Sequence, residues 1–196
     1  MALLTGLLLP FQVFNDVVLR VGRWVAIVAI GLMVLAILIQ VFFRYVLNNA
    51  LPWPDEAARF AMLWMTGLIA PMAYRRGGFV AIDMLVRALP ERIGAVLSLI
   101  LLFIAGAVLA VAIEIGWAES TGFMSRAKTA SLYYFDLTAG AWKKMPRQWM
   151  MLSFFVGIIL LTIVNIELIL RSVITLLGGG ERLKRLAPPE DELMAE

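Results

Sequence analysis

Three apolar runs, each long enough to cross a lipid bilayer, constrain the fold of this chain more than any other feature. The runs Trp24–Phe43 and Ile93–Ile113 carry no charged side chain, and the third, from about Met150 to Leu170, carries only Glu167. A helix rises about 1.5 Å per residue, so roughly 20 residues cover a hydrocarbon core about 30 Å thick. Lipid offers no hydrogen-bond partners to the backbone, and the runs are therefore predicted to be transmembrane helices.

A fourth span, at about residues 54–75, has a weaker pattern. Its uncharged run, Phe60–Tyr74, reaches full length only if the helix begins near Pro54, and Pro71 is expected to kink its last part. Gly67 offers a small surface for close helix packing. The predicted fold is an all-α integral membrane protein with spans at about residues 24–43, 54–75, 93–117 and 150–171, which together form a four-helix membrane domain over residues 24–175.

The composition supports this class and excludes several functions. Hydrophobic residues make up 62% of the chain and charged residues 16%, far from the average of soluble domains. The chain has no Cys and no His, which excludes disulfides and thiolate metal sites and removes the usual haem and zinc ligands. No nucleophile–base set or phosphate-binding glycine loop is visible. We expect neither enzymatic activity nor a cofactor in this chain.

The two ends of the chain differ from the spans. Residues 1–23 include apolar side chains at helical spacing, such as Phe11, Phe14 and Val18, with polar residues between them. This pattern predicts an N-terminal amphipathic helix in the membrane interface, with a signal anchor as the alternative. Residues 176–196 are charged and contain prolines, which is typical of a mobile tail.

The stretch from Arg44 to Trp64 places charges between the first two spans. Asp55 and Glu56 fall in the first turn of the second helix, where the helix dipole favours carboxylates. Arg59 follows them by four and three residues, so ion pairs with both are predicted. The other members of this outer hairpin are a cation at the preceding helix end and three aromatics suited to headgroup depth, namely Arg44, Tyr45, Trp53 and Trp64. The alternative is an interfacial helix start with no further role.

Further polar positions have two interpretations each. The segment Phe79–Leu89 predicts a short interfacial helix with an Asp83–Arg87 pair, and Asp83 contacts a partner subunit in the alternative interpretation. Glu114, near the end of the third span, either extends to the interface or couples to an ion. Glu167 and Arg171 are spaced for a structural ion pair.

The connection from Glu119 to Gln148 is the longest, and it mixes aromatic and cationic residues. This composition predicts a segment folded along the membrane surface.

The distribution of Lys and Arg predicts the orientation. With four spans and the N-terminus inside, ten cations face the cytoplasm and seven face outward. The short loops carry four cations inside and two outside, which places both termini in the cytoplasm. The inner four are Arg75, Arg76, Arg87 and Arg92, and the outer two are Arg44 and Arg59.

A transporter that works alone usually binds its solute on polar groups near the bilayer midplane. Here the middles of the spans are almost bare of polar side chains, which favours a membrane subunit whose chemistry lies in a partner. Two other classes remain open. One is a self-sufficient small homo-oligomeric transporter that uses Glu114, and the other is a redox membrane anchor, against which the missing His and Cys argue.

These residues carry a resemblance. The motif FRYVLNNALPWPDEAARFAMLW, the following Arg-Arg-Gly turn and the segment FVAIDMLVRALP resemble the small permease subunit, the DctQ-like component, of tripartite ATP-independent periplasmic (TRAP) transporters. The resemblance covers roughly residues 10–175. One departure is Phe79, where the family pattern has His, so a polar role at this position is in doubt, while Asp83 stands where the pattern has an acid.

The resemblance implies a division of labour in the bacterial cytoplasmic (inner) membrane. A periplasmic solute-binding protein captures an organic acid, and a large multi-spanning permease subunit carries it together with sodium by an elevator-like motion. The small subunit scaffolds the large one and helps to dock the binding protein, without binding substrate or metal itself. By resemblance, the outer hairpin fixes this interface through Arg44, Tyr45, Trp53, Asp55, Glu56, Arg59 and Trp64. Arg75 and Asp83 hold the inner interfacial helix.

Overall fold

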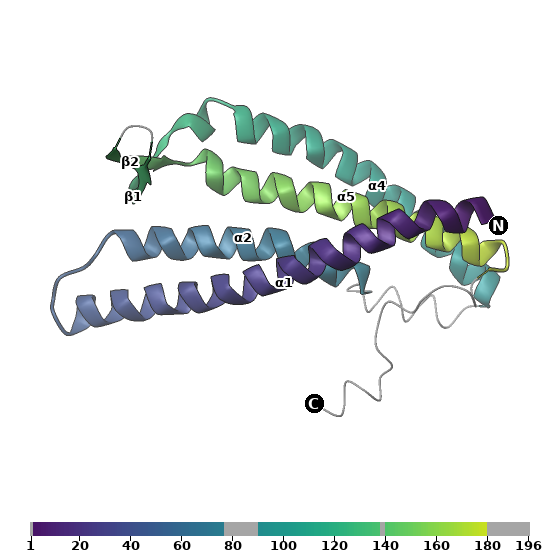
Figure 1. Cartoon of the computed structure of the whole chain (residues 1–196), viewed down its shortest axis with the longest axis horizontal. Helices are drawn as coiled ribbons and strands as arrows, with labels where there is room; N and C mark the ends of the chain where they lie inside the picture. The colour runs from purple at the N-terminus through teal and green to yellow at the C-terminus, as the bar shows by residue number, and fades with distance from the viewer. Residues whose placement is uncertain (1, 77–89, 138–139, 180–196) are drawn as a thin grey trace. The chain divides into compact units, whose positions relative to one another are not determined.

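Four long helices and one β-hairpin make up the described part of the chain (Figure 1). The computed structural model describes residues 2–76, 90–137 and 140–179. In chain order the elements are α1 (Ala2–Tyr45), α2 (Trp53–Arg75), α4 (Glu91–Thr121), the one-turn 3-10 helix η1 (Met124–Arg126), β1 (Lys128–Asp136), β2 (Ala141–Pro146) and α5 (Gln148–Leu176). The predicted helix at residues 79–89, with Asp83, and the tail from residue 180 onward lie outside the described residues.

Three of these helices are long and apolar enough to cross a membrane. Within the described residues the candidate spans are Leu8–Tyr45, Ile93–Thr121 and Gln148–Leu176. Their apolar runs are the three that dominate the sequence, and the prediction of a helical membrane protein is confirmed. Helix α2 exists as predicted but is not among these candidates.

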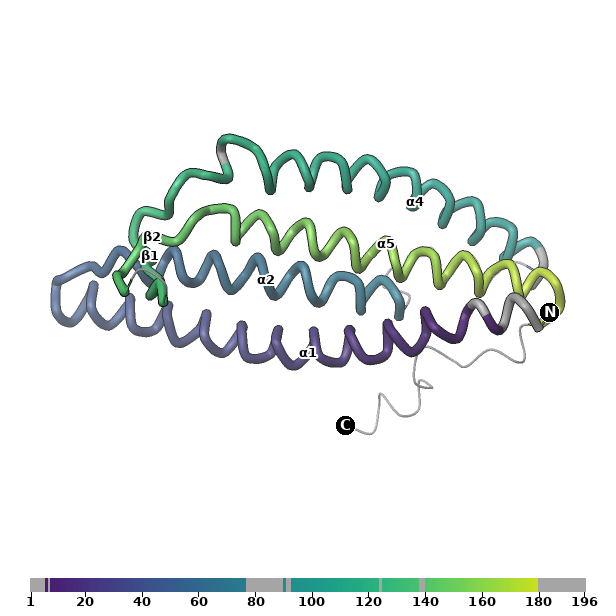
Figure 2. Tube along the Cα trace, turned by 45° about the horizontal axis from the view of Figure 1, so that its top comes forward, coloured from purple at the N-terminus to yellow at the C-terminus, as the bar shows by residue number. Residues whose placement is uncertain are grey.

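Helix α1 is continuous across the expected boundary between an interfacial segment and the first span. It runs without interruption through Pro10 and past residues 23 and 24 for 44 residues. At about 1.5 Å per residue it measures about 66 Å, roughly twice the thickness of a hydrocarbon core. Part of α1 therefore extends beyond the apolar layer. Figure 2 traces α1 as a continuous helix.

The connection between α4 and α5 adds a small β-hairpin to the helical fold. It contains the antiparallel strands β1 and β2, in which Tyr133 pairs with Lys144, Tyr134 with Lys143 and Phe135 with Trp142. Aromatic and β-branched residues fit the pleated surface of a strand. The sequence analysis assigned these aromatics to a membrane surface and overlooked that the consecutive aromatics Tyr133, Tyr134 and Phe135 also favour a strand.

The chain folds as two compact units, and each long helix contributes to both. The first unit comprises Met1–Leu19, Ala70–Val111 and Leu160–Glu196, and the second comprises Arg20–Ile69 and Ala112–Ile159. The first contains the buried polar side chains Asn15, Asn165 and Glu167, and the second contains the hairpin.

In the second unit, helices α2 and α5 approach each other at two glycines. A Cβ added at Gly67 would lie 2.5 Å from the carbonyl oxygen of Ser153, and one added at Gly157 would lie 2.9 Å from the Cα of Gly67. Backbones this close leave no room for a side chain at either position. The prediction that Gly67 serves close helix packing is confirmed.

Candidate functional site

The first unit has a buried carboxylate, Glu167, at its centre. Its side chain is fully buried and accepts hydrogen bonds from three helices. Asn15 Nδ2 of α1 donates to Oε2 at 2.5 Å, while Arg75 Nη2 of α2 and Arg171 Nε of α5 donate to Oε1 at 2.8 and 3.1 Å. An ionised carboxylate is stable in such a setting only when its lone pairs are filled. Both oxygens of Glu167 have such donors, so this condition is met.

Arg75 links this carboxylate to a second acid. Its Nη1 donates to Oδ1 of Asp16 at 2.5 Å, and its side chain is only 10% exposed, against 40% for Asp16. The four charged residues of the group, Asp16, Arg75, Glu167 and Arg171, sum to zero charge. Together with Asn15 we call them the charge cluster.

A second polar link lies in the same unit. The hydroxyl of Tyr74 donates to Oδ1 of Asn165 at 2.6 Å, and Nδ2 of Asn165 donates to the backbone carbonyl of Leu102 at 3.2 Å. A Cβ at Gly106 would lie 3.0 Å from that same amide nitrogen. The amide of Asn165 thus joins α2, α4 and α5, and with the charge cluster it connects parts of all four long helices within this unit.

In the second unit, a different carboxylate holds the hairpin to α2. Glu56 accepts the backbone N–H groups of Ala130 and Ser131, at 3.0 and 2.7 Å. The hydroxyl of Ser131 lies 2.6 Å from the same carboxylate and 3.0 Å from the carbonyl oxygen of Pro52. Strand β1 is thereby fixed against the first turn of α2.

The predicted ion pairs of Arg59 with Asp55 and Glu56 do not form between these three described residues. Arg59 and Asp55 are exposed, and the carboxylate of Glu56 is turned to the strand. The physical reason is that two backbone N–H groups and a hydroxyl offer Glu56 fixed donors. An exposed guanidinium is solvated and offers little in comparison.

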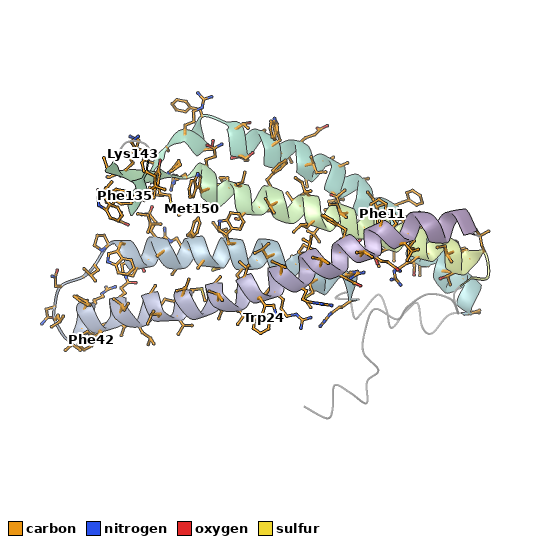
Figure 3. All side chains as sticks on the ribbon, in the orientation of Figure 1. Phe11, Trp24, Phe42, Phe135, Lys143 and Met150 are labelled. Carbon is orange, nitrogen blue, oxygen red and sulfur yellow. The ribbon has the colours of Figure 1, made fainter. Side chains whose placement is uncertain are left out.

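The hairpin has two different faces. One carries Tyr133, Phe135, Trp142 and Lys144, which we call the aromatic face. The other carries an ion pair between Lys143 and Asp136, at 2.6 Å, and Tyr134, whose ring lies 5.6 Å from that of Trp149. The hydrogen bond to Asp136 and the charge of that carboxylate raise the pKa of Lys143. Figure 3 labels Phe135 and Lys143 at this hairpin.

Comparison with known protein families decides the assignment. The chain matches the family described as tripartite ATP-independent periplasmic transporters, DctQ component, over residues 33–175. It belongs to this DctQ family. The resemblance seen in the sequence is confirmed, while no curated protein and no solved structure matches the chain. The DctQ match includes Glu56, the hairpin, Arg75 and Glu167, but it begins after Asn15 and Asp16.

The residues expected from the sequence at a partner interface all lie in the described part of the chain, except Asp83. Arg44 and Tyr45 are exposed at the end of α1, with the guanidinium carbon 5.8 Å from the ring centroid, and Trp53 is 39% exposed. Trp64 has a buried indole nitrogen without an acceptor among the described residues. Their role toward a partner remains a prediction. Glu114 is exposed on α4.

Arg75 lies at the end of α2, as expected, and the sequence analysis named no ion-pair partner for it. It pairs with Asp16 and Glu167, while Asp83 is outside the described residues. The predicted Glu167–Arg171 pair is confirmed at 3.1 Å. What the sequence analysis missed is that Glu167 is shared between two arginines and an amide.

Asn15, Asp16, Tyr74 and Asn165 are the site residues that the sequence analysis missed. Asn15 and Asp16 were assigned to the polar side of an interfacial helix, although Asn15 is only 1% exposed. Asn165 and Glu167 were the available signal, since two polar residues within one apolar span indicate a buried partner.

Proposed function

We propose that this chain is the small scaffold subunit of a sodium-coupled, binding-protein-dependent TRAP transporter for organic acids. Its partners are a large multi-spanning permease subunit of the elevator type and a periplasmic solute-binding protein. Membership of the DctQ family supports the assignment to a tripartite transporter. Solute, sodium and motion belong to the large subunit in this proposal.

The scaffold role is supported by the pairing of donors and acceptors within the charge cluster. Both oxygens of Glu167 accept donors from the chain itself, and the guanidinium of Arg75 bridges two carboxylates. A solute or ion site keeps some donors or acceptors free for its ligand. In this neutral cluster both oxygens of Glu167 and both terminal nitrogens of Arg75 are paired within the chain, and Arg75 Nε is its one buried nitrogen without a partner among the described residues. Pairing of this kind stabilises helix packing, which is what a subunit that stays still requires.

The exposed apolar surface of the helices fits a subunit that packs in the membrane. None of the most apolar stretch of α4 is buried within the chain, and only 11% of that of α1 is. Such surfaces are covered by lipid or by neighbouring helices, and small residues favour close approach there. A larger permease subunit is the partner that the DctQ family provides.

The membrane placement in this proposal is four spans in the inner membrane, with both termini in the cytoplasm. Helix α2 is the fourth span, and its 23 residues measure about 34 Å, enough for the hydrocarbon core. The outer hairpin between α1 and α2 (residues 44–64) then faces the periplasm. There, Arg44, Tyr45, Trp53, Asp55 and Arg59 are available to the large subunit or the binding protein. Glu56 is engaged with strand β1.

Reconstituted transport tests this function. Proteoliposomes receive the chain and its co-expressed large subunit, a sodium gradient and the binding protein outside, and uptake of radiolabelled organic acids is measured. We expect uptake only when all components are present, and an unchanged rate for Glu114→Gln. Uptake by the chain alone, or full-rate uptake by the large subunit without it, would contradict the scaffold role.

A further inference from the structure

The aromatic face of the hairpin is exposed although it consists of large rings. Tyr133, Phe135 and Trp142 are 54%, 48% and 69% exposed. Their arrangement is ordered across the two strands. The rings of Phe135 and Trp142 lie 5.5 Å apart edge to face, and the ammonium of Lys144 lies 5.8 Å from the centroid of Tyr133. Three rings and one cation therefore share one surface without cover from the rest of the described chain.

Covalent connections place this surface at the depth of the lipid headgroups. Strand β2 ends at Pro146, and α5, a candidate span, begins at Gln148. The Cα atoms of these two residues are therefore at most about 8 Å apart. At the other end of the hairpin, only the one-turn helix η1 separates β1 from the end of α4, which is a second candidate span. The bonds from Ala130 and Ser131 to Glu56 add a third attachment, which keeps the hairpin from extending away from the helix ends.

The charge of this connection is strongly positive. Residues 122–147 contain five cations and a single acid, Asp136, which pairs with Lys143. The other four cations have no acidic partner within the described residues, and they are Arg126, Lys128, Lys144 and Arg147. A surface with this charge is complementary to anionic lipid headgroups, each nearby cation favouring binding about fivefold.

We propose that the aromatic face is a binding surface for anionic phospholipid headgroups, with the three rings at the interface and Lys144 on the lipid phosphate. Tyr and Trp concentrate at this depth because one part of each ring system is apolar and the other is polar. The attachment of the hairpin to two span ends favours a lipid surface over a soluble protein as the occupant. This role goes beyond the proposed transport function and does not depend on the solute.

The absence of cysteine in the chain gives a clean test. Leu137, beside the aromatic face and 89% exposed, is replaced by Cys in the full chain and labelled with an environment-sensitive fluorophore. The labelled protein is placed in nanodiscs of phosphatidylcholine with or without phosphatidylglycerol. Quenching by lipids with a shallow doxyl group measures the ratio of lipid-immersed to water-exposed label. We expect phosphatidylglycerol to raise this ratio.

Two neighbouring lysines provide matched variants. Lys144→Gln should lower the ratio in phosphatidylglycerol about fivefold, the contribution of one cation at the surface. Lys143→Gln, on the opposite face, should have a smaller effect if contact is local. If only net charge mattered, Lys143→Gln would have at least as large an effect, because it also frees the carboxylate of Asp136. Equal effects of the two variants would overturn the proposal. A label that stays in water in both lipid mixtures would also overturn it, and would favour a soluble protein as the partner of the aromatic face.

Discussion

Glu167 and Glu56 are helical residues whose carboxylates each accept hydrogen bonds from other elements of the chain, in different surroundings. Glu167, in the first unit, is fully buried and accepts bonds from two arginines and an amide. Glu56, in the second unit, is half-buried and accepts backbone N–H groups and a hydroxyl of a strand 74 and 75 residues away. One carboxylate joins helices through balanced charge, and the other fixes a hairpin through backbone hydrogen bonds.

The difference shows what local spacing can predict. Both residues have an arginine three or four positions later, yet only Glu167 pairs with it. In the buried setting every charge needs a counter-charge, so the neighbour on the next turn is used. At the exposed helix start water screens the arginine, and rigid backbone donors prevail.

The largest expected effect comes from Glu167→Gln. Removing the charge leaves Arg75 and Arg171 without their shared counter-ion in a buried place, which should cost about 3–5 kcal/mol. Thermal unfolding of the purified chain in mild detergent measures the loss. Glu114→Gln is the control, because Glu114 is exposed, and its unfolding should stay close to that of the wild type. Equal stability of the two variants would show that the cluster does not hold the first unit.

Gly67→Ala examines whether the second unit depends on close backbone contact instead of buried charge. The new Cβ would meet the carbonyl oxygen of Ser153 at 2.5 Å, and relieving this overlap should cost about 1–3 kcal/mol. Gly31→Ala is the matched control, since nothing lies within 4 Å of the added atom and alanine favours a helix. The two substitutions should shift the unfolding temperature in opposite directions, and a stabilising Gly67→Ala would refute the contact.

Glu56→Gln should loosen the hairpin with a modest change in overall stability. It removes the charge from the hydrogen bonds to Ala130 and Ser131, at a cost of about 1 kcal/mol. Hydrogen exchange at these two amides should become faster, because they are the groups that Glu56 protects. Asp55→Asn, at an exposed position on the same turn, should leave their exchange unchanged. Slow exchange in both variants would mean that the strand is held by other contacts.

The smallest effect is expected for Arg59→Ala. Its side chain is exposed and forms no ion pair with the two acids before it, so the unfolding free energy should change by no more than about 0.5 kcal/mol. A loss of unfolding free energy well above this value would support the ion pairs of Arg59 that the sequence predicted. A normal unfolding temperature combined with a reduced yield of complex would instead place Arg59 at a partner interface.

The sequence allowed the helices and the family to be predicted, because twenty apolar residues in a row admit few structures in a membrane. It allowed one pair of the charge cluster, Glu167–Arg171, to be predicted because both members lie on one helix. Asn15, Asp16 and Arg75 come from other helices, and their meeting depends on packing that periodicity does not encode. The hairpin was missed because membrane-surface segments and strands draw on the same aromatic residues.

The most direct test of the scaffold role is a pull-down of the tagged chain from native membranes in mild detergent, with mass spectrometry of the co-purifying proteins. We predict a much larger multi-spanning partner at equal stoichiometry, and reduced recovery of it with Glu167→Gln. Recovery of the chain as a homo-oligomer without such a partner would contradict the scaffold role.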